Sequence, residues 1–395
     1  MKAGWTYKKL GEISARMADG PFGSNLKAEH YTTKKEVRII QLSNIGEEGW
    51  RENNVKYTSF EHLTKIARSE VFPNDIVIAK MMPAGRAIIC PNHEKKYVLS
   101  SDAVKVELKK GYDVHFITYS INSPYFREQV YENVVGIGRV RTSLTKLREC
   151  IIGIPPISEQ ERIVAYLDTQ FAKIDAMKAN AAKALAEAKA LFQSALTEAM
   201  TPKEGWKMKK IGDVFRSFSG GTPLKSVDEY YKGGNIPWLR SGEVCKKYIY
   251  KTEMFITEEG MKNSSAKYYP IDTVVVAMYG ATAAQVGILK ISSTSNQAVC
   301  GLLPNSDNLP EFVYYWFRFR QDFLASQAQG GAQPNISQIK IKNLDYPIIP
   351  LPEQERIVTR LDALSAKVAA LEANYTQTVA ECDALKQALL REVFE

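Results

Sequence analysis

The sequence predicts an α+β protein in which two similar mixed α/β domains are separated by two long antiparallel coiled-coil helices. It also predicts a pseudo-two-fold internal repeat. Three observations support this fold. The string Glu-Gln-Glu-Arg-Ile-Val begins at Glu159 and again at Glu353, 194 residues later. Short runs rich in β-branched residues, typical of strands, lie before each copy. A heptad pattern without Gly or Pro follows each copy, as in long paired helices.

Other parts of the chain also occur twice. The matched segments are "GWTYKKLGEI" from Gly4 and "GWKMKKIGDV" from Gly205, "FPNDIVIAKM" from Phe72 and "YPIDTVVVAM" from Tyr269, "SDAV" from Ser101 and "NQAV" from Asn296, and "SLTKLRECIIGIPP" from Ser143 and "SQIKIKNLDYPIIP" from Ser337. Their separations fall in steps from 201 through 197 and 195 to 194 residues. Such steps are expected when one fold is kept while its surface loops gain or lose residues.

Each copy predicts a compact domain followed by a helix. Strands are expected at 37–42 and 75–81 in the first copy and at 272–280 and 286–291 in the second. One helix per copy is expected at 116–130 and 311–327, and the aromatic run within the second is interpreted as core. The predicted divisions are 1–156 for the first domain, 157–201 for the first long helix, 202–351 for the second domain and 352–395 for the second long helix.

The two long helices are predicted to pair along an apolar seam. A helix of about 40 residues is about 60 Å long and would extend beyond a domain of this size. The alternative is that each helix packs only on its own domain. The residues expected in the seam are Ile163, Leu167, Ile174, Ala181 and Leu191 in the first helix and Ile357, Leu361, Val368, Leu371, Tyr375 and Leu385 in the second. The first-turn residues Glu159, Gln160, Glu353 and Gln354 are explained mainly by the positive end of the helix dipole, with a role in subunit docking as the alternative.

Composition narrows the class of protein. The formal net charge is +8 and 45% of the residues are hydrophobic, which indicates a folded protein with a modest preference for polyanions. No segment has the length and apolar character of a membrane span, and the N-terminus lacks a signal-peptide core, so a cytoplasmic protein is expected. The five scattered cysteines favour separate reduced thiols over a disulfide or zinc framework.

Enzyme classes find little support, and we expect no catalytic residue, no metal and no cofactor. Asp75 followed by Glu94 and Lys96 imitates a loose nuclease motif, but a turn before a strand explains Asp75 better. The chain has no phosphate-binding loop of the G-x-x-x-x-G-K-S/T type and no Asn/Asp-Pro-Pro-Tyr/Phe motif of aminomethyltransferases. Its histidines are solitary.

The order of the repeated segments resembles the DNA specificity subunit of type I restriction-modification systems. The resemblance covers essentially the whole chain, and its most specific parts are Pro155–Ile163 and Pro350–Ile357. It implies a non-catalytic subunit whose two target recognition domains each bind one half of a split, asymmetric sequence in double-stranded DNA. It also implies that the helices set the gap between the halves. The implied partners are DNA methyltransferase (modification) subunits, two in number, and restriction/translocase subunits attached through them. The alternative is a coiled-coil scaffold without sequence-specific DNA binding.

Three pairs of polar loops are candidates for contact with DNA, with ordinary turns or a solvated surface as the alternative. Arg suits guanine, whereas Asn and Gln suit adenine. The loops before each junction offer Arg139, Arg141 and Lys146 in the first copy and Gln333, Asn335 and Lys340 in the second. The loops after the equivalent strands offer Lys80 and Arg86, and Tyr279, Thr282 and Gln285. The early Gly-rich loops offer Ser24, Asn25 and Lys27, and Thr222 and Lys225, with Arg240 and Ser241 as weaker candidates.

Overall fold

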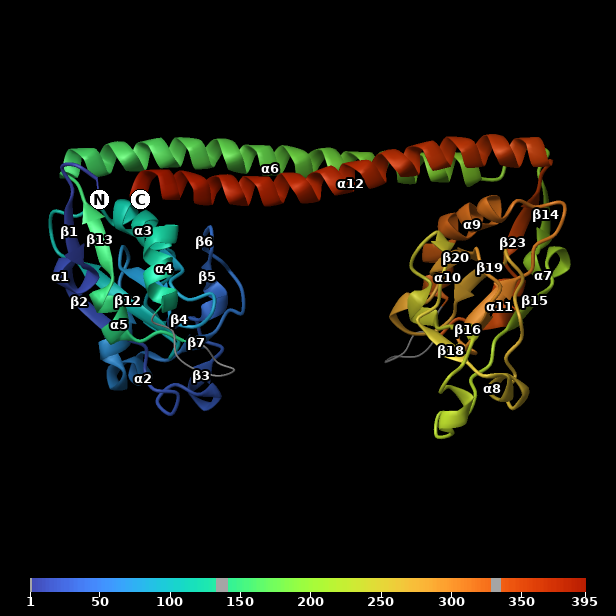
Figure 1. Cartoon of the computed structure of the whole chain (residues 1–395), viewed down its shortest axis with the longest axis horizontal. Helices are drawn as coiled ribbons and strands as arrows, with labels where there is room; N and C mark the ends of the chain where they lie inside the picture. Colours follow the sequence, from blue (N-terminus) through green and yellow to red (C-terminus); the bar gives the residue numbers. More distant parts are fainter. Residues whose placement is uncertain (1, 133–140, 328–334) are drawn as a thin grey trace. The chain divides into compact units, whose positions relative to one another are not determined.

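The computed structural model describes residues 2–132, 141–327 and 335–395. The chain divides into two compact units, of which unit 1 comprises Met1–Ala182 and Tyr375–Glu395 and unit 2 comprises Lys183–Asn374. Each unit contains one α/β domain and a part of both long helices (Figure 1). We call the domain of unit 1, which runs from its first strand to the start of the first long helix, domain 1. Its counterpart in unit 2 is domain 2.

Domain 1 is built from short strands and helices. Its strands are β1 (Thr6–Lys9), β2 (Ser14–Asp19), β3 (Tyr31–Thr32), β4 (Val37–Ile40), β5 (Ile45–Gly46), β6 (Gly49–Trp50), β7 (Tyr57–Thr58), β8 (Glu70–Val71), β9 (Ile76–Ala79), β10 (Ala87–Ile89), β11 (Tyr97–Leu99), β12 (Ala103–Leu108) and β13 (Ile151–Ile154). Its helices are α1 (Leu10–Ile13), α2 (Phe60–Lys65), α3 (Val114–Asn122), α4 (Pro124–Glu132) and α5 (Leu144–Glu149), with 3₁₀ turns η1 (Ala28–His30), η2 (Leu42–Asn44) and η3 (Ala67–Ser69). The first long helix, α6, spans Ile157–Met200.

Domain 2 repeats this order with fewer strands. Its strands are β14 (Lys207–Lys210), β15 (Ser217–Ser219), β16 (Ile236–Leu239), β17 (Tyr248–Ile249), β18 (Met254–Ile256), β19 (Val274–Ala277), β20 (Val286–Leu289), β21 (Thr294–Ser295), β22 (Val299–Leu302) and β23 (Asp345–Ile348). Its helices are α7 (Ile211–Val214), α8 (Glu258–Lys262), α9 (Pro310–Phe319), α10 (Gln321–Ser326) and α11 (Gln338–Lys342), with 3₁₀ turns η4 (Asp228–Tyr230), η5 (Ser241–Glu243) and η6 (Gly280–Thr282). The second long helix, α12, spans Leu351–Phe394.

The two domains share one sheet topology. In domain 1 a sheet of order β10-β9-β12-β2 stands beside one of order β3-β7-β4-β11-β8. In domain 2 the equivalent sheets have the orders β15-β22-β19-β20-β17 and β18-β16-β21. Both second sheets contain a parallel pair, β4 with β11 and β16 with β21, within otherwise antiparallel surroundings. The predicted internal repeat of mixed α/β domains is therefore confirmed.

Hydrogen-bond register corrects two of the sequence matches by one residue. Ile78 faces Val104 in domain 1, and Val276 faces Cys300 in domain 2, so these strand positions are 198 and 196 residues apart. The matching of the Pro-x-Asp and Ala-Val motifs had placed them 197 and 195 apart. The reason is that the turn residue with positive φ before the strand is Asn74 in one copy and Asp272 in the other. Asp75 therefore has no carboxylate counterpart in domain 2.

The helix expected once in each domain is broken into two. In domain 1, α3 ends before Ser123 and α4 begins at Pro124. The reason is that a proline disfavours helical geometry at the residue before it, here Ser123. In domain 2, α9 ends at Phe319 and α10 begins at Gln321. The aromatic run of α9 is core as expected, since Phe312, Tyr315, Trp316 and Phe317 are buried.

The long helices contribute to the core of each domain at their ends. In unit 1, Ile163 and Leu167 of α6 and Leu390 and Phe394 of α12 are buried in the core of domain 1. In unit 2, the buried core includes Leu196 and Met200 of α6 and Ile357 and Leu361 of α12. Each domain core therefore contains the end of one long helix and the start of the other.

The two helices pack together within each unit and run antiparallel. In unit 1 the Nζ of Lys178 lies 2.5 Å from a carboxylate oxygen of Asp383, and Lys386 is hydrogen-bonded to Asp175. In unit 2, Lys189 lies 2.5 Å from Glu372. Along the pair, residue numbers rise in α6 as they fall in α12. The predicted antiparallel pair is confirmed, and it coexists with packing of each helix on a domain.

The buried stripe departs from the predicted seam toward the end of each helix. Leu191 is 62% exposed and Leu385 is 46% exposed, so these two predictions are wrong. The neighbouring Phe192 and Lys386 face inward instead. A straight helix drifts by ~20° per heptad against a strict seven-residue repeat, so after four heptads the stripe moves by nearly one residue. The other predicted seam positions are buried or half-buried, namely Ile163, Leu167, Ile174, Ala181, Ile357, Leu361, Val368, Leu371 and Tyr375.

Two further findings concern the cysteines and the length and apolar character of the helices. All five cysteines are free thiols, and four of them are buried. Within the described ranges of the chain, no helix is both long enough and apolar enough to cross a membrane.

Candidate nucleic-acid interface

Three segments that are distant in sequence meet on one side of domain 1. They are the loop 19–25 after β2, the residues that follow β9, and the residues that precede α5. The backbone N–H of Lys80 donates to the carbonyl of Asp102 at 2.9 Å, and that of Thr142 donates to the carbonyl of Lys80 at 2.9 Å. Met81 and Arg141 form an antiparallel bridge. Residues of all three loops also line one cleft, so the loops that were predicted separately form a single surface.

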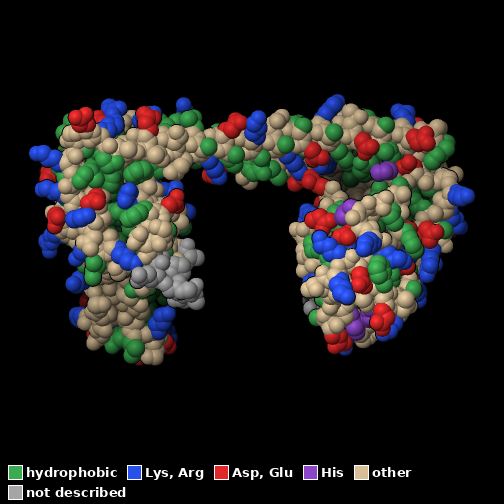
Figure 2. Space-filling view, turned by 180° about the vertical axis from the view of Figure 1, so that it is seen from behind, with side chains coloured by type: hydrophobic (Ala, Val, Ile, Leu, Met, Phe, Trp, Pro, Cys, Tyr) green, Lys and Arg blue, Asp and Glu red, His purple; other side chains and the backbone are tan. Residues whose placement is uncertain are grey.

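This surface surrounds a cleft of about 790 Å³. Its cationic lining residues are Lys65, Arg68, Lys80 and Arg141, and its acidic ones are Asp19 and Asp102. The Nζ of Lys80 lies 2.6 Å from Asp19, which fixes the position of this half-buried lysine at the wall of the cleft. Figure 2 shows Lys and Arg side chains interspersed with Asp and Glu on the visible face of unit 1, which is the body that carries the histidines.

Gly20 allows the end of β2 to lie close to the backbone of the segment before β12. Its N–H donates to the carbonyl of Ala103 at 3.0 Å. A Cβ atom on Gly20 would stand 1.7 Å from the carbonyl oxygen of Ser100, and one on Gly220 would stand 2.1 Å from that of Ser295. Both domains therefore need glycine at the end of this strand, because no side chain fits between the two backbones.

Domain 2 has the same backbone frame with different side chains. The N–H of Met278 donates to the carbonyl of Ala298 and the N–H of Ile336 donates to that of Met278, both at 2.8 Å. Tyr279 and Asn335 form the bridge that corresponds to Met81 and Arg141. Thr222 donates its hydroxyl hydrogen to Gln297. Hydroxyl and amide groups thus occupy the surface that carries cations in domain 1.

Several predicted contact residues make hydrogen bonds within their own turns, and Asn25 among them also lines the cleft. Ser24 donates to the side chain of Asn25, and the backbone N–H of Lys27 donates to His30. The backbone N–H of Lys146 caps α5 through the Ser143 hydroxyl. In domain 2 the Thr282 hydroxyl donates to the carbonyl of Tyr279. These positions remain predictions.

Other predicted residues are engaged elsewhere or lie outside the described chain. Arg86 is largely buried, donates to the carbonyl of Pro83 and lies 4.0 Å from Glu47. Arg240 forms ion pairs with Glu243 and Glu253. Lys340 donates to the carbonyl of Gln327. Lys225 is exposed, and Ser241 and Gln285 are half-buried. Arg139 and Gln333 fall outside the described residues.

The residues of the nuclease-like motif are used structurally. Asp75 lies 3.6 Å from Lys105, and both are buried. Burial raises the pKa of Asp75 above its ordinary value, opposed by the hydrogen bond from the Phe72 backbone. Glu94 accepts a hydrogen bond from Tyr57 at 2.6 Å, which raises the pKa of Tyr57 to about 12. Within the described ranges, no three His, Cys, Asp or Glu side chains are placed to hold a metal.

The sequence-based interpretation missed the role of two glutamines. Gln160 accepts from the backbone N–H of Asp113 and donates to the carbonyl of Pro155. Gln354 accepts from the N–H of Leu309 and donates to the carbonyls of Asp307 and Ile349. Both side chains are buried, so they tie each long helix to its domain and do not serve as polar first-turn residues facing solvent. Their recurrence in both copies of the repeated string was the available signal.

Their glutamate neighbours act locally. Glu159 lies 2.6 Å from Arg162, and Glu353 lies 2.7 Å from Arg356. These pairs on the exposed side of the first turn leave the dipole explanation open for the two glutamates.

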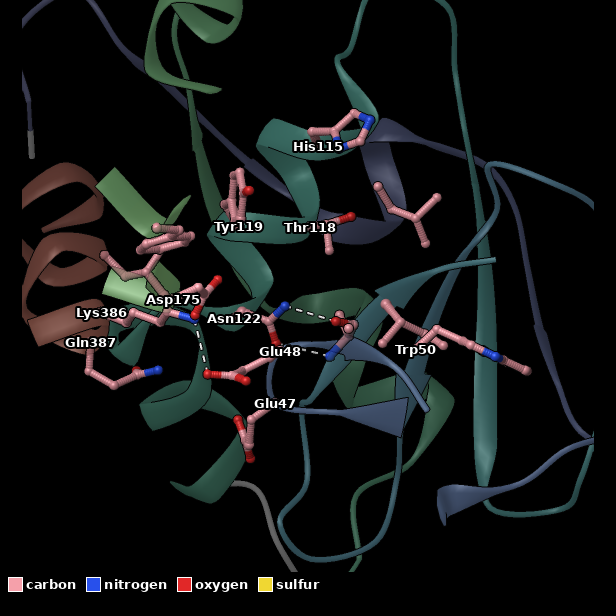
Figure 3. Close-up of a pocket in the computed structure, with 16 residues that line it drawn as sticks. Glu47, Glu48, Trp50, His115, Thr118, Tyr119, Asn122, Asp175, Lys386 and Gln387 are labelled. Atoms are coloured by element: carbon pink, nitrogen blue, oxygen red, sulfur yellow. Dashed lines mark hydrogen bonds and ion pairs between the residues drawn. The ribbon is translucent and has the colours of Figure 1, made fainter. Parts of the chain in front are cut away.

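A second cavity of unit 1, of about 350 Å³, lies where domain 1 meets the long helices (Figure 3). Glu48, between β5 and β6, lies 2.7 Å from Lys178 of α6 and 3.0 Å from Lys386 of α12. The hydrogen bond from Lys178 holds the pKa of Glu48 below its ordinary value, with a further contribution from Lys386. In domain 2 the two charges are exchanged. There the domain supplies the cation, Lys247, and α12 supplies the carboxylate, Asp362.

The chain belongs to a family of DNA specificity domains. The family model, described as the type I restriction modification DNA specificity domain, matches it twice, over residues 3–186 and 203–381. The repeat found in the sequence thus corresponds to two copies of one family domain, and the suspected resemblance is confirmed.

Individual relatives agree with this assignment. The chain is 28% identical over 209 residues to the type I restriction enzyme EcoR124I/EcoR124II specificity subunit of Escherichia coli, an alignment that covers 51% of each protein. The chain thus spans about half the length of that relative. It is 20% identical over 358 residues to the EcoBI specificity subunit of Escherichia coli, covering 82% of this chain and 73% of that one.

Solved structures share the fold. One match is a chain from a structural study of complex assembly and conformational transition of the type I R-M system. Its TM-score is 0.78 and its sequence identity 19%, and the match covers 100% of this chain and 98% of that one. The HsdS subunit from Thermoanaerobacter tengcongensis matches with a TM-score of 0.57 and 18% identity, covering 100% and 97%.

Proposed function

We propose that this chain is the non-catalytic specificity subunit of a type I restriction-modification complex. Domain 1 and domain 2 would each bind one half of a split, asymmetric sequence in double-stranded DNA. The observation that carries the proposal is that one backbone frame presents two different sets of side chains. Cations surround the cleft of domain 1, whereas Thr222, Tyr279 and Asn335 lie on the corresponding surface of domain 2.

The proposed chemistry follows from these side chains. Lys65, Arg68 and Lys80 suit phosphate oxygens, and Arg141 suits the guanine edge in the major groove. Asn335 and Gln297 suit adenine, whose edge offers one donor and one acceptor. Two surfaces of different chemistry favour an asymmetric target.

The proposed partners are enzyme subunits. Methyltransferase subunits, two in number, would dock on the chain, and restriction/translocase subunits would attach through them. Catalysis would lie in those partners, with no cofactor held here. A coiled-coil scaffold without DNA binding is the second candidate, and family membership does not favour it. The predicted divisions at residues 156, 201 and 351 are kept as the units for exchange experiments.

Methylation mapping tests the proposal. We expect cells with the gene, together with its partner subunits, to carry one split methylated sequence that is lost when the gene is deleted. Replacing residues 1–156 with the equivalent part of another family member should change one half of that sequence and leave the other half unchanged. A change in both halves would contradict the assignment of one half to each domain. Unchanged methylation after deletion would contradict the function itself.

A further inference from the structure

Domain 1 exposes an aromatic side chain at the tip of its first loop. Phe22 is 83% exposed, the largest exposure of any large hydrophobic side chain in the described part of the chain. It lies between β2 and η1, on the loop that begins at Gly20. Single exposed apolar side chains are common on protein surfaces, so the interaction site is inferred from how the loop holds Phe22 and from the residues beside it.

The loop holds Phe22 in a defined position. The N–H of Asn25 donates to the carbonyl of Phe22 at 2.7 Å and closes a tight turn. The carbonyl of Asn25 is hydrogen-bonded to Nε2 of His62 at 2.8 Å, which links the turn to α2. On the other side, Gly20 is bonded to Ala103. The ring is therefore presented from ordered backbone, so little conformational entropy is lost when a partner covers it.

The surroundings of Phe22 indicate the chemistry of that partner. The residue lines the same cleft as Lys65, Arg68, Lys80 and Arg141. With Asp19 and Asp102, the lining has four cationic and two acidic side chains, a net charge of +2, and this excess of positive charge beside one apolar ring fits a polyanion that also offers flat apolar surfaces. Duplex DNA has both, because its phosphates flank stacked bases, and proteins that deform DNA insert apolar side chains between base steps.

Domain 2 has an apolar residue at the corresponding turn. Leu224 is 64% exposed. The N–H of Val227 donates to its carbonyl at 3.1 Å, and η4 follows this turn as η1 follows the turn of Phe22. Counted from the shared glycine, Phe22 corresponds to Thr222. The exposed apolar residue therefore stands two positions later in the loop of domain 2 than in that of domain 1.

We propose that Phe22 and Leu224 are wedges, each of which partly enters the base stack of the half-site bound by its own domain. This inference rests on the proposed function. Insertion is favoured over contact with a thymine methyl group because an exposed fraction of 83% leaves both faces of the Phe22 ring open. A methyl group would cover one face, whereas insertion between two base pairs covers both.

Permanganate reactivity of thymines tests the proposal, because unstacked thymines react faster than stacked ones. The probe is a duplex with the split sequence found by methylation mapping and with A·T pairs in and beside each half. With the full-length wild-type chain, we expect increased reactivity at one step in each half. Phe22→Ala should remove the increase in one half only and weaken binding by about ten-fold or more. Leu224→Ala should act on the other half.

The controls separate insertion from other effects. Phe22→Trp should retain the reactive step, and Leu385→Ala, which removes an exposed apolar side chain from α12, should change neither reactivity nor affinity. Thermal unfolding should be unchanged in Phe22→Ala, since the side chain makes little contact in the free protein. Selective binding without any reactive thymine would overturn the wedge and leave the proposed function intact. Absence of selective binding by the wild-type chain would also overturn the wedge, whereas the proposed function stands or falls with the methylation mapping.

Discussion

The candidate surfaces of the two domains differ in charge, although the same backbone hydrogen bonds hold their loops. Lys80 and Met278 occupy equivalent positions. The N–H of each donates to the residue just before a core strand, Asp102 before β12 and Ala298 before β22, and the carbonyl of each accepts from the segment before the junction. Arg141 in one domain is replaced by Asn335 in the other. The comparison teaches that backbone hydrogen bonds fix where the loops lie, whereas the side chains on those loops are free to differ.

The interiors of the domains differ as well. Lys105 and Asp75 form a buried ion pair in domain 1, with 1% and 6% of their side chains exposed. The equivalent strand positions in domain 2 are Gly301 and Thr273, and the ring of Tyr269 packs against Gly301. A charged interior pair and an aromatic ring on glycine are thus alternative ways of filling the same site.

The largest expected effect comes from breaking the buried pair. Asp75→Ala should destabilise domain 1 by about 3–5 kcal/mol, because Lys105 would remain buried without its partner. Thr273→Ala, at the equivalent position of domain 2, should cost about 1 kcal/mol, since it removes one hydrogen bond to Pro270. Denaturant unfolding of the full chain measures both values. Combining Asp75→Leu with Lys105→Met should restore most of the loss, and equal costs for the two single variants would refute the comparison.

The next effect concerns DNA affinity and its dependence on salt. Arg141→Ala should weaken binding of the mapped duplex by about 1–3 kcal/mol, and removal of a charge near the phosphates should reduce the salt slope. Asn335→Ala should weaken binding by a similar amount with the salt slope unchanged, because no charge is removed. Titrations at several salt concentrations provide the measurement. A reduced slope for Asn335→Ala would argue against the division into charged and neutral surfaces.

The smallest expected effect concerns the contact of domain 1 with the long helices. The pKa of Glu48 is held low in the folded protein by Lys178 and Lys386, so its charge stabilises the fold above the ordinary carboxyl pKa of about 4.3. That contribution is lost as pH falls through the folded pKa. Glu48→Gln should therefore lower stability by about 0.5–1 kcal/mol near neutral pH and by progressively less in acid. Glu161→Gln, at an exposed position of α6, is the matched control and should leave the stability near neutral pH unchanged.

The sequence by itself determined the parts of this protein that depend on local or repeated patterns. Glu159 and Glu353 marked the repeat, the heptads marked both long helices, and the same motifs indicated the family. The tertiary structure decided what depends on contacts between distant segments. It set the strand register that leaves Asp75 without a counterpart, and it turned Leu191 and Leu385 out of the seam. It also brought the loops of Phe22, Lys80 and Arg141 into one surface. The physical reason is that a periodic pattern fixes the form of a segment, whereas hydrogen bonds between strands and packing of side chains fix which segments meet and in what register.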